Sequence, residues 1–134
     1  MQALVVGSGR VGSTLSKALA EAGWDVVVID ENEQALELLG DWRGAFVVGH
    51  GMDAGVLEEA GIREADAVIC ATDGDNTNIV VAQIATRKYG VDRVAARVHD
   101  PARAEFFADR GFAVVSPVKS AISELTRWAL AEER

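Results

Sequence analysis

The stretch GSGRVG, residues 7–12, stands directly between an apolar run at residues 3–6 and a segment whose apolar residues recur at helical spacing. In this G-x-G-x-x-G pattern, Gly7 permits a tight turn, Gly9 lets the backbone approach a phosphate, and Gly12 allows close packing of the helix. The free amides that open the helix carry partial positive charge and form an anion site. A glycine-rich turn without a ligand is the alternative, but the strand before it and the helix after it favour phosphate binding.

Short apolar runs alternate with helix-spaced apolar residues along the rest of the chain. Uninterrupted apolar runs are typical of parallel strands that are buried on both faces and covered by helices. We therefore predict an α/β fold: a single Rossmann-like, doubly wound domain over residues 1–134, with about six mainly parallel strands and helices on both faces. The predicted strands are residues 3–6, 26–29, 45–48, 67–71, 94–98 and 113–115.

Several residues mark where the covering helices begin and end. Asp53 is suited to cap a helix that Gly61 ends, and Asp100 is suited to cap one with Pro101 in its first turn and Gly111 at its close. The first helix is marked by apolar residues at helical spacing and a glycine stop. These residues are Val11, Leu15, Ala18, Leu19, Ala22 and Gly23.

The composition fits one compact core, with 49% hydrophobic and 25% charged residues in a chain of 134. Thirteen basic and twenty-one acidic residues give a net charge of −8, which disfavours nucleic acid and anionic membranes as general partners. The apolar runs are only strand-sized and the N-terminus lacks the regions of a signal peptide, so we expect a cytoplasmic protein. The lone cysteine, Cys70, fits a reducing compartment.

Asp30 ends the second predicted strand, 23 positions after Gly7. This spacing is close to that of the carboxylate that accepts hydrogen bonds from a ribose in dinucleotide-binding domains. The same carboxylate would repel a 2′-phosphate, which favours NAD or an adenine nucleotide over NADP. The alternative role is to cap a helix that begins near Glu31 or Asn32, and the two roles are compatible.

Two further loops, residues 49–53 and 70–75, follow the third and fourth predicted strands. The carboxyl ends of successive strands in a doubly wound sheet line one crevice, so we expect these loops to join Gly9 and Asp30 around a single ligand. His50 is placed either to hydrogen-bond or stack on a base, or to lie in a surface loop without a ligand.

Two arginines are candidate phosphate ligands. Arg97 ends the fifth predicted strand, and an ion pair with Asp73 or Asp100 is its alternative role. Arg10 is the better candidate because it lies within the glycine loop itself and does not depend on strand register.

No convincing catalytic group emerges from the sequence. Cys70 falls in an apolar strand and is expected in the core, while His50 and His99 lie at different strand ends without an evident carboxylate relay. Asn76 and Asn78 open a helix and are placed to cap it or to bind a ligand. We therefore predict no enzyme activity.

Six stretches taken together are far more specific than the glycine loop alone. They are GSGRVG at 7–12, VID at 28–30, GHGMD at 49–53, VLEEAGIREADAVICATD at 56–73, VAARV at 94–98 and VVSP at 114–117. Almost the whole chain thus resembles the N-terminal nucleotide-binding domain (RCK, KTN or TrkA-N) of the regulators of potassium conductance, found in Trk and Ktr uptake systems and potassium channels. The resemblance implies NAD(H) or ATP/ADP as an effector, assembly into homodimers or higher rings, and control of a membrane-embedded potassium transporter or channel subunit from its cytoplasmic side.

The resemblance also assigns roles to positions. It implies phosphate contacts at residues 9–11, a ribose contact at Asp30 and base contacts at residues 50–52. Thr72, Asp73 and Arg97 would complete the pocket. The full predicted cofactor-binding set is Gly7, Ser8, Gly9, Arg10, Val11, Gly12, Asp30, Glu31, His50, Gly51, Met52, Ala71, Thr72, Asp73 and Arg97.

The sequence departs from the family pattern in three ways. His50 stands where relatives often have aspartate or asparagine, which bears on base preference. Val118 stands where some members have an acidic ligand for a divalent ion, so we predict no metal site. The second ligand-binding domain usual in the family is missing, so we expect either one domain of a longer regulator or a short regulator that works with another subunit.

Three functions remain open from the sequence. A regulatory module for potassium transport is the first, an NAD-dependent oxidoreductase or a fragment of one is the second, and a structural Rossmann domain with an empty crevice is the third. A dehydrogenase needs a substrate-binding segment and a proton-transferring residue, and neither is evident in this length.

The final predicted helix, residues 120–131, carries Ile122, Leu125, Trp128 and Ala129 on one stripe. This stripe either folds back on its own sheet or packs on a second copy of the chain. We favour the dimer, because a tryptophan on an apolar helix face is a typical interface anchor and the resembling family crosses subunits with its last helix.

Overall fold

The computed structural model describes residues 1–132, which form a parallel six-stranded sheet in the order β3-β2-β1-β4-β5-β6. The strand order reverses between β1 and β4, and in sheets of this kind ligands bind outside the carboxyl ends at that point. The predicted fold class is confirmed, and the predicted strands differ from the observed ones by at most one residue at either end. The strands are β1 Gln2–Val6, β2 Asp25–Asp30, β3 Ala45–Val48, β4 Ala67–Cys70, β5 Arg93–Arg97 and β6 Ala113–Val115. The predicted domain end at residue 134 lies outside the described residues.

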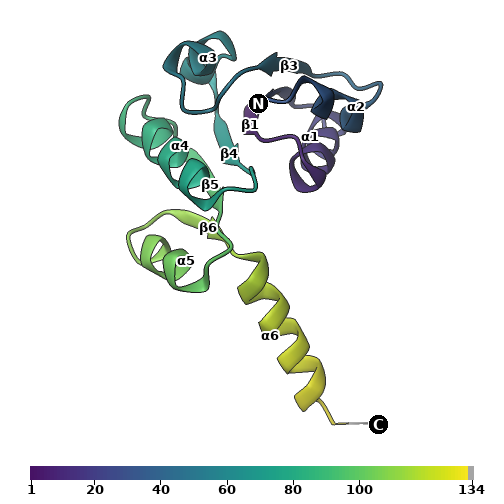
Figure 1. Cartoon of the computed structure of the whole chain (residues 1–134), viewed down its shortest axis with the longest axis vertical. Helices are drawn as coiled ribbons and strands as arrows, with labels where there is room; N and C mark the ends of the chain where they lie inside the picture. The colour runs from purple at the N-terminus through teal and green to yellow at the C-terminus, as the bar shows by residue number, and fades with distance from the viewer. Residues whose placement is uncertain (133–134) are drawn as a thin grey trace.

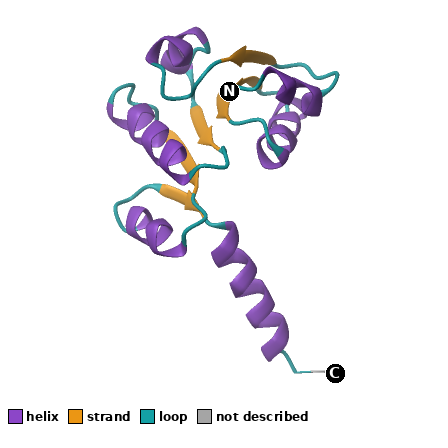
Figure 2. Cartoon of the chain, viewed as in Figure 1, coloured by secondary structure: helices purple, strands orange, loops and turns teal. Residues whose placement is uncertain are grey.

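Helices connect successive strands, as Figures 1 and 2 show. The predicted caps are confirmed: Asp53 accepts a hydrogen bond from the amide of Gly55 at 2.8 Å, and Asp100 accepts one from the amide of Ala102 at 3.2 Å. The helices are α1 Arg10–Glu21, α2 Leu36–Leu39, α3 Ala54–Glu59, α4 Asp75–Arg87, α5 Pro101–Ala108 and α6 Pro117–Leu130, with 3₁₀ turns η1 Glu33–Ala35 and η2 Ile62–Glu64.

Apolar side chains pack on both faces of the sheet, because successive residues of a strand point to opposite faces. In β1, Leu4 and Val6 join the core cluster that includes residues of α3, α4 and α5. Ala3 and Val5 join the second cluster, together with residues of α1 and α2 such as Leu39. The two clusters fix the sheet between its helices and hold the strand ends in place.

Helix α1 does not bury the stripe of apolar residues that marked it in the sequence. Its buried residues are small ones, among them Gly12, Ser16 and Ala20, whereas Val11 is 45% exposed. Small side chains let the helix lie close to the glycine loop. The apolar spacing therefore predicted the helix correctly but did not identify the face that packs on the sheet.

Helix α6 extends away from the rest of the molecule (Figure 1). Within Pro117–Leu130 no residue is buried, and Trp128 is 80% exposed. The alternative in which this helix folds back on its own sheet is therefore wrong. Among residues 1–132 no helix is both long and apolar enough to cross a membrane.

Candidate functional site

A cleft of about 610 Å³ opens at the carboxyl ends of the strands, where the strand order reverses. Its walls come from Val6 at the end of β1, Asp30 at the end of β2, Gly49 after β3 and Ala71 after β4. This volume is within the usual range for small-molecule and cofactor sites. The four loops thus meet around one cavity, as the sequence predicts.

The three glycines of the loop differ in whether the fold leaves room for a side chain. Gly7 has φ +105°, and a Cβ atom there would lie 2.8 Å from the backbone of Ala71 and Thr72. A Cβ atom on Gly12 would collide with the carbonyl oxygen of Gly7. Apart from Gly9 itself and its two chain neighbours, no heavy atom of residues 1–132 lies within 4 Å of a Cβ atom built on Gly9. The fold therefore requires Gly7 and Gly12, whereas Gly9 leaves open space beside the start of α1.

The carboxylate of Asp30 holds the glycine loop. Its Oδ2 accepts a 2.8 Å hydrogen bond from the amide of Ser8, and its Oδ1 accepts a 2.8 Å hydrogen bond from the amide of Asn32. The 3₁₀ turn that follows is capped by Asn32, which accepts from the amide of Gln34 at 3.0 Å, so the capping role belongs to Asn32. Each carboxylate oxygen has two acceptor sites, which leaves Asp30 able to accept further hydrogen bonds at the edge of the cleft.

His50 lies beside a carboxylate that the sequence did not make evident. Its Nε2 is 3.8 Å from Oε2 of Glu31, and its Nδ1 accepts a hydrogen bond of 3.2 Å from the amide of Met52. Because Nδ1 accepts, the neutral ring carries its proton on Nε2. The cleft wall therefore presents a hydrogen-bond donor and a carboxylate side by side.

Asn78 connects the ends of β4 and β5, a role that the sequence analysis did not recognise. The side chain is fully buried; its Oδ1 accepts from the amide and the hydroxyl of Thr72 at 2.9 and 2.7 Å. Its Nδ2 donates to the carbonyl oxygens of Thr72 and Arg97 at 2.9 and 2.8 Å. A polar residue in helical register with the buried Ala82 and Ala85 was the signal for this role.

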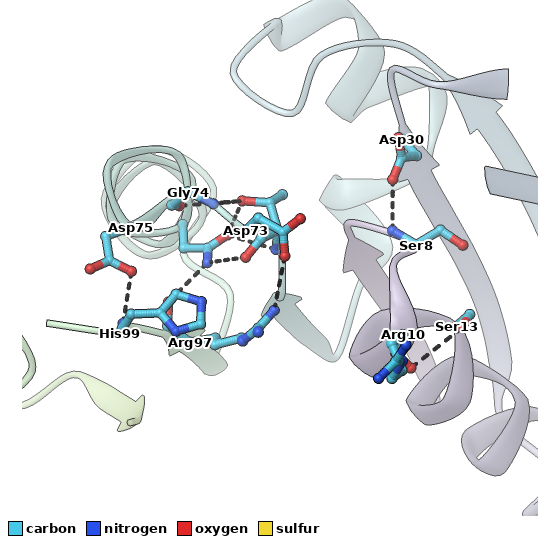
Figure 3. A network of polar contacts seen from close by, with 11 residues as sticks. Ser8, Arg10, Ser13, Asp30, Asp73, Gly74, Asp75, Arg97 and His99 are labelled. Carbon is cyan, nitrogen blue, oxygen red and sulfur yellow. Dashed lines mark hydrogen bonds and ion pairs between the residues drawn. The ribbon is translucent and has the colours of Figure 1, made fainter. Parts of the chain in front are cut away.

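The two arginines lie outside the residues that line the cleft. Arg97 pairs with Asp73, its Nη1 lying 3.5 Å from Oδ1 of that residue, which is one of the two ion-pair alternatives (Figure 3). Arg10 is exposed at the first position of α1. The charged residues of the described chain that line the cleft are all acidic: Asp30, Glu31, Glu37 and Asp73.

The cleft brings most of the predicted residues together. Those that line it are Gly7, Ser8, Gly9, Asp30, Glu31, His50, Gly51, Ala71, Thr72 and Asp73. Those that do not are Arg10, Val11, Gly12, Met52 and Arg97. Lining residues outside the predicted set are Val6, Asn32, Gln34, Ala35, Glu37, Leu38, Gly49, Gly74 and Thr77. Most of the latter belong to the segment after β2, where the sequence carried no signal beyond Asp30 and Glu31.

Two ionisable groups near the cleft have shifted pKa values. Burial raises the pKa of the Cys70 thiol to about 12, so this side chain is a protonated core residue. Desolvation raises the pKa of Asp75, but hydrogen bonds from the amides of His99 and Asp100 outweigh it and leave the pKa below its usual value. Within residues 1–132, no group of three His, Cys, Asp or Glu residues is placed to hold a metal ion.

This combination of a reversing parallel sheet, a glycine loop and a cleft over the strand ends defines a Rossmann-type nucleotide-binding fold. The chain belongs to the TrkA-N domain family, whose pattern matches residues 3–117.

Two curated relatives show what the chain resembles in sequence. It is 41% identical over 131 residues to the Trk system potassium uptake protein TrkA of Streptomyces coelicolor, covering 97% of this chain and 59% of that protein. It is 35% identical over 130 residues to a TrkA homologue of Methanothermobacter thermautotrophicus, covering 95% of this chain and 59% of that protein. The chain thus spans somewhat over half the length of these relatives.

Solved structures have the same fold. The TrkA-N domain of the inner membrane protein ybaL from Escherichia coli superposes with a TM-score of 0.83 at 24% identity, covering 97% of this chain and 96% of that one. The Kef C-terminal domain of Shewanella denitrificans in its AMP-bound form superposes with a TM-score of 0.82 at 20% identity, covering 97% of this chain and 80% of that one. The GsuK channel bound to NAD superposes with a TM-score of 0.70 at 27% identity, covering 85% of this chain and 21% of that one.

Proposed function

We propose that this chain is a regulatory nucleotide-binding domain that controls a Trk- or Ktr-type potassium transporter or channel in response to NAD(H) or ATP/ADP. The observation that carries the proposal is the cleft at the glycine loop, with open space beside Gly9 and the Asp30 carboxylate at its edge. Support for the potassium system comes from the family and from relatives named as Trk potassium uptake proteins. Support for the ligand comes from GsuK, which is described as bound to NAD and to ADP.

The residues present fit such a ligand. The first-turn amides of α1 have no helical acceptor, and the empty space beside Gly9 gives a phosphate access to them. Asp30 has acceptor capacity left for ribose hydroxyls, and its charge opposes a 2′-phosphate. His50 and Glu31 offer a donor and an acceptor to the edge of a base.

The ligand acts in this proposal as an effector and not as a substrate. The Thr72 hydroxyl donates to Asn78, and the Cys70 thiol is buried and protonated, so neither is an activated nucleophile. An NAD-dependent oxidoreductase is the second candidate, favoured by the fold alone. Oxidation of NADH with a panel of small carbonyl compounds separates the two, because only the oxidoreductase turns the cofactor over.

A homodimer or higher ring is the assembly that we propose. A groove of about 480 Å³ runs over the sheet face beside α1, lined by Leu15, Leu19, Ile69 and Ala95 among others. The exposed apolar stripe of α6 would cover such a groove on a second copy. A reciprocal exchange of α6 would bury both apolar surfaces and join two nucleotide sites into one unit. That unit would act from the cytoplasmic side of the membrane through its pore-forming partner.

Ligand binding is tested by calorimetry and thermal shift with NADH, NAD⁺, ATP, ADP and NADPH, and by mass spectrometry of any nucleotide that copurifies. We expect saturable binding of at least one adenine nucleotide without a 2′-phosphate, and weaker binding of NADPH. If none of the five shifts the melting temperature or gives heat at millimolar concentration, the domain is not a nucleotide sensor. The potassium role is tested by flux through the Trk transporter with and without the full-length regulator.

A further inference from the structure

Arg97 and Asp73 form an ion pair at the edge of the cleft. Arg97 extends from the end of β5 toward the β4–α4 loop, and Asp73 meets it from that loop (Figure 3). The two partners differ greatly in freedom: the side chain of Arg97 is 19% exposed, whereas that of Asp73 is 99% exposed. The Arg97 backbone is held by the hydrogen bond from buried Asn78.

The pair leaves the arginine incompletely satisfied. Its Nε is buried and has no hydrogen-bond acceptor among residues 1–132. A separation of 3.5 Å between Nη1 of Arg97 and Oδ1 of Asp73 is longer than a charge-assisted hydrogen bond, which is usually 2.7–2.9 Å. The guanidinium therefore keeps unused capacity for a second, better-fitting anion.

The cleft itself lacks a cation for an anionic ligand. Its charged lining residues are all acidic among those the structure describes, and Asp73 is one of them. A phosphate that enters would be repelled by these carboxylates, and it would be stabilised if a nearby guanidinium were turned toward it. Arg97 is next to the lining, and among residues 1–132 only Asp73 forms an ion pair with it.

We propose that Asp73 is a built-in competitor for Arg97, which a phosphate group of the bound nucleotide displaces. This inference rests on the proposed function and adds to it a mechanism by which the site distinguishes a phosphorylated nucleotide from a nucleoside. Displacement is easy because the exposed Asp73 carboxylate regains its water when it leaves, and the 3.5 Å contact that it gives up is longer than a charge-assisted hydrogen bond. The phosphate offers a guanidinium two parallel hydrogen bonds in place of one long contact.

The exchange gives Asp73→Asn a diagnostic effect. Removing the competing carboxylate should tighten binding of ADP by about threefold to tenfold, and it should leave binding of adenosine unchanged. General repulsion between Asp73 and the phosphate would also tighten ADP binding, so the single variant does not separate the two explanations.

A double-mutant cycle separates them, with ADP and adenosine binding measured by calorimetry for wild type, Asp73→Asn, Arg97→Gln and the double variant. If Asp73 acts by competing for Arg97, its removal tightens ADP binding only while Arg97 is present. An equal gain in the Arg97→Gln background, or no gain in either, overturns the exchange. Glu37→Gln, an acidic neighbour on the same cleft, serves as the matched control and should give a smaller gain than Asp73→Asn.

Folding and the underlying function are checked in the same series. Circular dichroism and thermal melting establish that each variant is folded. If Arg97→Gln does not fold, Arg97→Lys replaces it. A lysine keeps the charge but loses the paired donors, so the tightening of ADP binding by Asp73→Asn should be smaller in that background. Binding of ADP to wild type with no dependence on Asp73 overturns the exchange alone. Absence of binding by both ADP and NADH to wild type overturns the exchange and the proposed function together.

Discussion

The side-chain amide of Asn78 donates a 2.8 Å hydrogen bond to the carbonyl oxygen of Arg97, which ties α4 to the end of β5. The same amide nitrogen donates to the carbonyl oxygen of Thr72 at the end of β4, and Oδ1 accepts from the Thr72 amide. Parallel strands that diverge at their ends lose backbone partners there, and Asn78 supplies them. One buried side chain thus sets the spacing of two strand ends at the cleft.

We expect Asn78→Ala to lower the free energy of unfolding by about 2–4 kcal/mol, because it removes a fully buried side chain and leaves half-buried backbone groups of Thr72 and Arg97 without these partners. Urea denaturation followed by circular dichroism measures the change. Asn76→Ala, at an exposed position in the same helix, is the control and should change stability by less than about 0.5 kcal/mol. Equal effects of the two substitutions would show that Asn78 has no special structural role.

The glycine loop gives a matched pair of substitutions. Gly12→Ala places a Cβ atom against the Gly7 carbonyl oxygen and should destabilise the fold by about 1–3 kcal/mol or prevent folding. Gly9→Ala meets no atom of the described chain and has an ordinary extended backbone, so its stability should stay within about 0.5 kcal/mol of wild type. Its affinity for ADP or NADH should nevertheless fall about tenfold, because the methyl group occupies the approach to the α1 amides. Unchanged affinity in Gly9→Ala would place the phosphate elsewhere.

Sequence reasoning identified the strands and the cleft because both depend on local patterns. Apolar runs such as residues 26–29 are typical of strands that helices cover on both faces, and the carboxyl ends of successive strands in a doubly wound sheet line one crevice. The packing face of α1 could not be read in the same way. There Gly12 lies against the carbonyl oxygen of Gly7 and the small Ser16 is buried, and hydrophobicity does not report shape.

Long-range polar contacts were the second feature that could not be predicted from the sequence. Asn78 and Arg97 are separated by 19 residues, and only the fold brings the amide of one to the carbonyl oxygen of the other. The ion pair of Arg97 was one of two alternatives from sequence, Asp73 or Asp100, because choosing between them requires the direction of the loop after β4. Local signals thus placed the residues near the cleft but not their partners.

Asp30→Ala is expected to weaken binding of NAD(H) or an adenine nucleotide by about 1–3 kcal/mol, because a charge-assisted ribose contact is lost. The variant should at the same time discriminate less strongly against NADPH. Since Asp30 also holds the amide of Ser8, thermal melting must accompany the calorimetry, and Asp30→Asn is the conservative comparison. Equal nucleotide affinity in wild type and Asp30→Ala would remove the ribose assignment without affecting the fold.

The Asp75 carboxylate predicts a pH dependence of stability. The pKa of Asp75 in the folded chain is lower than its usual value of about 4. The charged carboxylate therefore stabilises the fold above pH ~4, and this stabilisation is lost as the pH falls through the pKa of the folded chain. Asp75→Asn should therefore be less stable than wild type at pH 7, and the difference should narrow toward pH 3. Denaturation midpoints between pH 3 and pH 7 measure the difference in stability between wild type and Asp75→Asn. Asp41→Asn, at an exposed loop position, is the control. A difference that stays constant with pH would contradict the contribution of the charge.

The last prediction concerns α6, whose Leu125 and Trp128 are 68% and 80% exposed. If this helix packs on a second copy, Leu125→Glu should shift the full chain from dimer to monomer, because a charge would be buried in the apolar contact. Ser123→Glu adds the same charge to the opposite face of the helix and should leave the dimer intact. Light scattering across micromolar concentrations gives the mass, and calorimetry with ADP or NADH checks that the monomer still binds nucleotide. Removal of the residues after Pro117 should give the same monomer. Should wild type be monomeric at these concentrations, or Leu125→Glu remain dimeric, α6 is not the main contact between subunits.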